Sequence, residues 1–137
     1  MKTLAAALIA LFVVAGDVSA QAVDSSRYAA VAFSKKTGKY GYGYDHPSRF
    51  SAERAALRNC PEADAKVLTW TRFGYIVLLI AADGSPGFGQ VNGAGANSRD
   101  AYEEALANLR KNTKSPIKTY VRVCSGDVAP VVKTFAE

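Results

Sequence analysis

The sequence predicts an α+β fold in which duplicated ββαβ units form one mainly antiparallel sheet with two helices packed on one face. Three observations lead to this prediction. Segments of the same kind recur in the same order in residues 28–73 and 75–124, each half holds a strand in which aromatic residues alternate with glycine, and each such strand precedes an alanine-rich segment that begins with Ser-Arg. An ordered recurrence of this kind indicates an internal repeat.

The first half is predicted to contain strand, turn, strand, helix and strand. In order, these elements are expected at 28–34, 35–38, 39–45, 48–60 and 66–73. Ser48 is the predicted N-cap of the helix, because its hydroxyl can accept a hydrogen bond from an unpaired N–H of the first turn. Pro47 ends the strand before it, since proline cannot donate a hydrogen bond to a strand ladder.

The second half repeats this order. The segment at 75–82 is continuously apolar, which is typical of a central strand covered on both faces. A strand is expected at 87–93, a helix at 98–110 with Ser98 as its predicted N-cap, and a strand at 117–124 whose alternation leaves one face in water. The tail at 127–137 is either an extra strand or a loose end.

The glycines of the two Gly-aromatic strands have a predicted packing role. Successive residues of a strand point to opposite faces, so Gly41 and Gly43 leave one face of their strand bare, and residues 87–89 repeat the pattern. Glycine allows another backbone to come close, and we therefore expect an alanine-lined helix over each bare face. A phosphate-binding loop is not indicated, because it would place glycines in a turn before a helix.

The aromatic residues on the opposite face are the candidate binding residues. Tyr40, Tyr42 and Tyr44 share one face of their strand. Together with Trp70 they are candidates for an exposed platform for sugar rings or for the surface of a partner, as exposed aromatic patches commonly form. The interpretation favoured over it is a second small core, in which loops or the C-terminal tail cover the same rings.

Residues 1–20 are predicted to be a signal peptide, with Lys2, an apolar stretch at 4–14 and the small residues Val-Ser-Ala before the cleavage position. Cleavage is expected between Ala20 and Gln21, which leaves residues 21–137 as a single exported domain, secreted or periplasmic. The apolar stretch is too short to span a bilayer of roughly 30 Å, and no later segment is long and apolar enough to do so.

The two cysteines and the charge bound the chemistry further. In an exported chain, Cys60 and Cys124 are predicted to form one structural disulfide. The formal net charge of +5 is scattered, so specific nucleic-acid binding is not expected. With His46 as the only histidine and the cysteines predicted to be oxidised, neither a metal site nor a cofactor is expected.

Several segments resemble a secreted bacterial family known as domain of unknown function 4189. The matching segments are YAAVAFS, TGKYGYGYDHPSRFSAERAALRNC, KVLTWTR and the later YVRVCSG. The resemblance covers about residues 28–126 and is closest in 28–73. It implies an exported, repeat-containing α+β domain and implies no activity. Many members have further cysteines; here residues 63–65 and 73–75 hold those places, so the family's extra disulfide is expected to be missing.

These observations favour a small exported, non-catalytic binding domain that contacts envelope polysaccharide or another exported protein, for example as an inhibitor or immunity-type partner. The first alternative is a secreted hydrolase. It would use either a Cys60–His46 pair or paired carboxylates. The carboxylates available for that role are Asp45, Glu53, Glu103 and Glu104. The second alternative is a structural or stress-related exported protein.

Overall fold

A computed structural model describes residues 27–93 and 95–136, so the predicted signal peptide and its cleavage position lie outside the described residues. The elements in chain order are β1 (Tyr28–Phe33), β2 (Tyr40–His46), α1 (Arg49–Arg58), β3 (Lys66–Arg72), β4 (Tyr75–Ala81), β5 (Pro86–Val91), α2 (Ser98–Arg110), β6 (Ile117–Cys124) and β7 (Val131–Thr134). The tail therefore adds a strand. No helix in the described ranges is long and apolar enough to cross a membrane.

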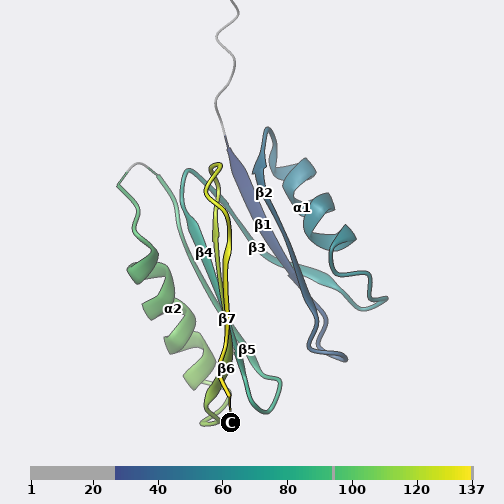
Figure 1. Cartoon of the computed structure of the whole chain (residues 1–137), viewed down its shortest axis with the longest axis vertical. Helices are drawn as coiled ribbons and strands as arrows, with labels where there is room; N and C mark the ends of the chain where they lie inside the picture. The colour runs from purple at the N-terminus through teal and green to yellow at the C-terminus, as the bar shows by residue number, and fades with distance from the viewer. Residues whose placement is uncertain (1–26, 94, 137) are drawn as a thin grey trace, which may run out of the picture.

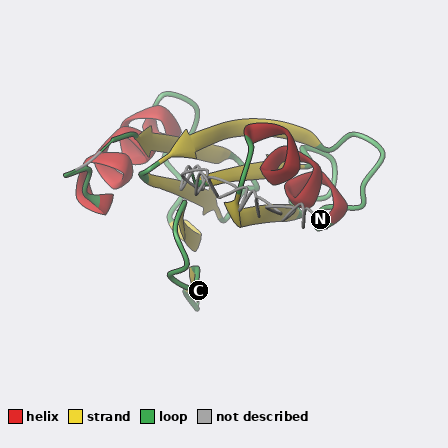
Figure 2. Cartoon of the chain, turned by 90° about the horizontal axis from the view of Figure 1, so that it is seen from above, coloured by secondary structure: helices red, strands yellow, loops and turns green. Residues whose placement is uncertain are grey.

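The strands form two antiparallel sheets, ordered β2-β1-β3 and β5-β4-β6-β7. Figure 1 shows the sheets side by side, with α1 and α2 on opposite outer faces, and Figure 2 shows the helices at the two ends of the molecule with the strands between them. The α+β class and the antiparallel pairing are confirmed. The prediction of one sheet with both helices on one face is wrong.

The reason for two sheets lies at the link between the halves. The chain passes from β3 to β4 through Phe73 and Gly74 alone. Phe73 has a positive φ of 52°, and a Cβ on Gly74 would lie 1.7 Å from the carbonyl oxygen of Val91. The link thus turns the chain across the molecule, and β4 joins the second sheet instead of pairing with β3.

The inner faces of the two sheets share one apolar core. It consists of the fully or nearly fully buried residues Ala29, Val31, Phe33, Ile76, Leu78, Ile80, Val121 and Val123. Each outer face forms a separate core with its own helix, through Ala52 and Ala56 of α1 and through Ala101 and Ala105 of α2. Strands β1 and β4 are buried on both faces for this reason, which confirms the central position predicted for 75–82.

The expected packing of a helix on a glycine-lined strand is confirmed in both halves. A Cβ on Gly41 would lie 2.4 Å from the carbonyl oxygen of Ala56, and a Cβ on Gly89 would lie 2.2 Å from that of Ala101. A methyl group at either glycine would therefore force the helix away from the strand. Each helix also donates a side-chain amide hydrogen bond to the strand, from Asn59 to the Tyr42 carbonyl and from Asn108 to the Phe88 carbonyl, both at 2.8 Å.

The predicted N-cap is confirmed for one helix and wrong for the other. The Ser48 hydroxyl accepts a hydrogen bond from the Ser51 N–H at 3.1 Å. In α2, the cap is Asn97, whose side chain accepts from the Asp100 N–H at 3.0 Å, and Ser98 is the first helical residue. An alignment of the two Ser-Arg sequences is therefore shifted by one residue relative to the alignment of the two N-caps.

The predicted disulfide between Cys60 and Cys124 is absent, and both thiols are free. The Cys60 sulfur lies 3.4 Å from the carbonyl oxygen of Lys39, just before β2 begins. Cys124 precedes Ser125, whose carbonyl accepts from Asp45 at the far end of β2. A strand of this length spans roughly 20 Å, whereas a disulfide needs Cα atoms about 4.4–6.8 Å apart. The number of residues between the two cysteines in the sequence gives no information about this distance.

Candidate binding groove

The structure brings three of the four candidate binding residues together. Tyr40, Tyr42 and Tyr44 are half-buried and pack against the core between the sheets, and the rings of Tyr42 and Tyr44 lie 6.3 Å apart. Trp70 lies on the other face of its sheet, 6.1 Å from the ring of Tyr28 and covered by the Arg49 guanidinium at 4.5 Å. The four residues therefore do not form one aromatic face.

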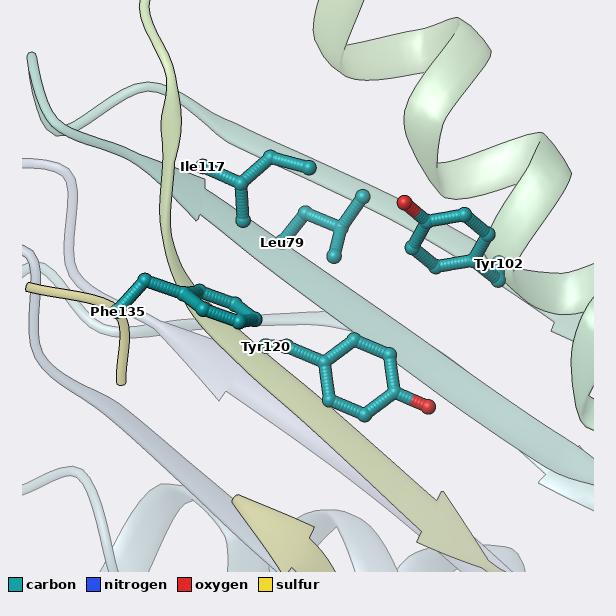
Figure 3. Close-up of a pocket in the computed structure, with 5 residues that line it drawn as sticks. All are labelled: Leu79, Tyr102, Ile117, Tyr120 and Phe135. Atoms are coloured by element: carbon teal, nitrogen blue, oxygen red, sulfur yellow. The ribbon is translucent and has the colours of Figure 1, made fainter. Parts of the chain in front are cut away.

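An aromatic groove lies elsewhere, on the outer face of the second sheet. It has a volume of about 220 Å³ and is lined by Leu79, Tyr102, Ile117, Tyr120 and Phe135. Figure 3 shows the ring of Tyr102 extending from α2 toward the sheet, with the rings of Tyr120 and Phe135 on the side away from the helix. We refer to these five residues as the β6 groove.

The β6 groove is open because α2 covers only part of its sheet. The helix packs on β5 and β4, where Gly87 and Gly89 let it lie close. The outer face of β6 therefore receives no helix, and Tyr102 reaches it only by its ring, 6.1 Å from that of Tyr120 and tilted by 55°. The backbone N–H of Phe135 donates to the Lys118 carbonyl at 2.8 Å and fixes the tail at the groove.

Cationic side chains share this face of the sheet. Arg122 follows Tyr120 two positions later on β6, and Lys133 lies directly opposite Tyr120 on β7, so both belong to the same face. Within the described ranges, neither side chain forms an ion pair or a hydrogen bond. The groove thus combines apolar ring faces with positive charge at its border, which suits a ligand with flat apolar faces and acidic groups.

The sequence contained a signal for this groove. Tyr120 stands on the polar side of the alternating segment 117–124, where an aromatic ring is out of place unless something covers it. Tyr102 lies on a helix with an alanine-lined buried face. Periodicity alone could not show that a ring from the helix and a ring from the strand would meet, because their contact depends on where α2 crosses the sheet.

The residue pairs required by the hydrolase alternative do not meet. His46 is at the C-terminal end of β2, whereas the Cys60 sulfur lies next to the Lys39 carbonyl oxygen, at the N-terminal end of the same strand. Burial raises the pKa of the Cys60 thiol. Asp45 is held by an ion pair with Arg27.

The remaining candidate carboxylates lie on helices at opposite sides of the molecule. Glu53 on α1 pairs with Arg49 at 2.7 Å, and Glu103 on α2, next to Glu104, pairs with Arg99 at 3.0 Å. In the part of the chain that the structure describes, no three His, Cys, Asp or Glu side chains are grouped as metal ligands.

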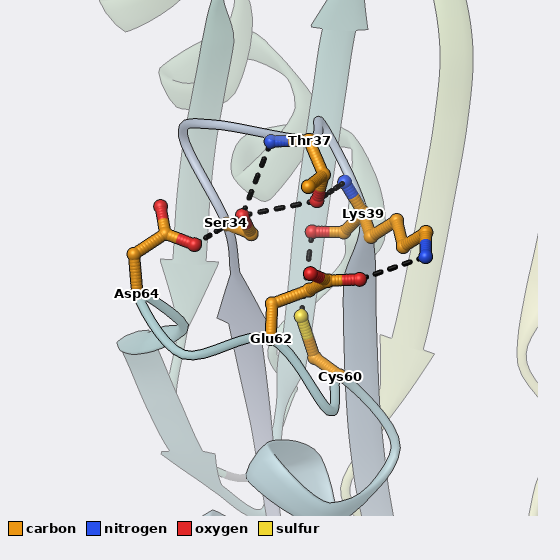
Figure 4. A network of polar contacts seen from close by, with 6 residues as sticks. All are labelled: Ser34, Thr37, Lys39, Cys60, Glu62 and Asp64. Atoms are coloured by element: carbon orange, nitrogen blue, oxygen red, sulfur yellow. Dashed lines mark hydrogen bonds and ion pairs between the residues drawn. The ribbon is translucent and has the colours of Figure 1, made fainter.

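A network of polar contacts connects the β1–β2 hairpin to the loop after α1 (Figure 4). The buried Ser34 hydroxyl donates to Asp64 at 2.6 Å, and Lys39 forms an ion pair with Glu62 at 2.7 Å. The hydrogen bond from Ser34 lowers the pKa of Asp64. These contacts tie the hairpin to the loop that follows α1.

In the second half, a hydrogen bond also joins the strand hairpin to the segment after the helix, but here the carboxylate belongs to the hairpin and the hydroxyl to the segment after the helix. Asp83 in the β4–β5 turn accepts hydrogen bonds from the Thr113 hydroxyl after α2 and from the Ser85 N–H at 3.0 Å. The Thr113 bond contributes most to lowering the pKa of Asp83 to about 2.

Comparison with protein families identifies a match for most of the described residues. The family model described as Domain of unknown function (DUF4189) matches residues 28–124. No curated protein and no solved structure matches the chain.

Proposed function

This chain belongs to the DUF4189 family, and we propose that it is an exported, non-catalytic module that binds acidic envelope polysaccharide in the β6 groove. The observation that carries the proposal is the meeting of the Tyr102, Tyr120 and Phe135 rings in one cavity. Aromatic rings gathered at a concave surface are a common way to hold a ligand with apolar faces, and pyranose rings have such faces.

The charge at the border supports an acidic ligand. Arg122 and Lys133 lie on the same sheet face as Tyr120, and their side chains are available to carboxylate groups of a bound polymer. A polymer lying along β6 would contact the rings with its sugar faces and the cations with its acidic groups. Attraction by exposed charges weakens as salt screens them, so retention should decrease at high ionic strength.

Retention on insoluble wall material and on a phosphate-free acidic polysaccharide tests the proposal. Tyr120→Ala with Phe135→Ala should reduce retention at least about tenfold, since each ring contributes on the order of 1 kcal/mol or more by contact. Leu57→Ala is the control, because Leu57 is an apolar residue of α1 that is 39 % exposed and does not line the groove. Equal retention of the folded double variant and the control would refute the proposal.

The predicted tyrosine platform is tested in the same assay. Tyr42→Ala with Tyr44→Ala should leave retention by the remaining folded protein unchanged, because these rings pack against the core between the sheets. Their loss should appear as lower stability in a melting experiment. A loss of retention in a fully folded variant would instead assign binding to the tyrosine face.

Binding to another exported protein is the second candidate, and one observation favours it. Three of the exposed large apolar residues lie in the C-terminal segment: Val128, Val132 and Phe135 are 54 %, 43 % and 49 % exposed. Val132 lies in β7 and the other two flank it. This strand is an edge strand, and exposed apolar edges pair readily with other chains. Val132→Asp should abolish capture of a protein partner and leave polysaccharide retention unchanged.

A further inference from the structure

A second cavity lies on the other side of the molecule, against α1. It has a volume of about 220 Å³ and is lined by His46, Phe50, Ser51, Arg54 and Arg58. Two of the side chains are guanidinium groups one helical turn apart, and the imidazole of His46 comes from the end of β2. We propose that this cavity binds the phosphate group of a phosphate-bearing ligand.

The positive charge of the cavity is not neutralised by acidic neighbours. The acids nearest along the chain pair with other cations: Asp45 with Arg27, Glu53 with Arg49, and Glu62 with Lys39. Within the described residues, Arg54 and Arg58 form no ion pair and no hydrogen bond. Guanidinium groups that lie free around one cavity are suited to phosphate, because their planar donor geometry matches its oxygens.

The fold itself does not require these arginines. Ala52 and Ala101 take the same place in the two halves, since each carbonyl oxygen lies against the second glycine of its strand. Counted from these alanines, the counterparts of Arg54 and Arg58 on α2 are Glu103 and Ala107. The second helix packs on its sheet with an acid and a small residue at these positions. The charge on α1 therefore serves something other than packing.

The apolar side of the cavity indicates how a larger ligand would lie. Phe50 is 68 % exposed, and the Arg54 guanidinium stacks over its ring at 5.5 Å. This stacking holds Arg54 in place without using its hydrogen-bond donors. A phosphate at the guanidinium groups would leave its organic carrier against the Phe50 ring.

Proton NMR of His46 provides a direct test, because it is the only histidine of the chain and its ring signals need no assignment. Inorganic phosphate and glycerol phosphate are titrated into the protein at constant ionic strength. In a third arm, sedimentation is measured with phosphatidylcholine vesicles that contain or lack phosphatidylglycerol. The test variant is Arg54→Gln with Arg58→Gln, and the charge-matched control is Lys35→Gln with Lys114→Gln, at two exposed lysines elsewhere.

We expect a saturable shift of the His46 signals that the arginine variant weakens at least about tenfold and the lysine variant leaves unchanged. If only anionic vesicles bind, and with the same dependence on the arginines, the phosphate belongs to a lipid headgroup. No binding in any arm, or equal losses in the two double variants with unchanged circular dichroism, would overturn the proposal.

Discussion

At the scale of single residues, the two cysteines differ most from what the sequence suggests. Cys60 is 1 % exposed beneath the end of α1, while Cys124 is partly exposed at the end of β6. Burial raises the pKa of the Cys60 thiol, which keeps it protonated and unreactive in neutral solution. The two residues therefore behave as a structural thiol and an accessible thiol.

We predict that an alkylating reagent modifies Cys124 in the native protein and Cys60 only after unfolding. Mass spectrometry of the protein purified without reductant should show one modification under native conditions and two in denaturant. Cys124→Ser is the control and should show no modification in the native state. Denatured protein with no free thiol would contradict the structure and restore the disulfide.

At the scale of elements, the approach of each helix to its strand is set by glycine. Gly89→Ala should lower the free energy of unfolding by about 1–3 kcal/mol or more, because a Cβ would lie 2.2 Å from the Ala101 carbonyl oxygen and the backbone of α2 must move. Gly126→Ala is the matched control, since its Cβ would meet only the Cys124 sulfur at 3.9 Å. Urea unfolding measures both variants.

An unchanged urea midpoint in Gly89→Ala would show that α2 moves away freely, and would remove the reason for the glycine. Movement of α2 also changes the position of Tyr102. We therefore expect Gly89→Ala to weaken binding in the β6 groove beyond its effect on stability.

At the same scale, the matching order of elements in the two halves was visible in the sequence, but the register of the two helices on their strands was not. The Ser-Arg pairs align Ser48 with Ser98, whereas the glycine contacts align Ala52 with Ala101. Both Asn97 and Ser98 are good capping residues. The buried alanines of α2 determine which of the two residues is the N-cap, because starting the helix one residue later would turn polar side chains toward the glycine-lined strand.

At the scale of the whole molecule, two carboxylates that accept side-chain hydrogen bonds make the stability of the fold depend on pH. The pKa of Asp83 in the folded protein is about 2, below its ordinary value of 3.8, and that of Asp64 is also lowered. A lowered folded-state pKa stabilises the fold above the unfolded value, and this contribution is lost as the pH falls through the folded value. The contribution of Asp83 therefore disappears between about pH 4 and pH 2, and that of Asp64 is lost in the same direction as the pH falls.

We predict that Asp83→Asn with Asp64→Asn reduces the fall in the urea midpoint between neutral and strongly acid solution. Asp127→Asn is the control, because Asp127 accepts no hydrogen bond within the described ranges. If the double variant and the control lose stability equally on acidification, the hydrogen bonds to Ser34 and Thr113 have no such role.

The sequence by itself determined the local features of this protein. The order of the elements, the antiparallel α+β class, the Ser48 cap and the glycine-lined strands all follow from periodicity and from residue type within a short window. The same kind of reasoning predicts a disulfide between the two cysteines. That prediction is wrong because residue type and cellular location say nothing about the distance between the two thiols in the fold.

Only the tertiary structure decided how the halves combine. The turn at Phe73–Gly74 sends β4 into a second sheet, which separates the two thiols, partly buries the tyrosines of β2 and places the helices on opposite faces. The packing of α2 on β5 and β4 leaves the outer face of β6 without a helix, and the β6 groove exists for that reason. Such features depend on which surfaces of distant segments come to lie against each other, and local sequence patterns do not specify this.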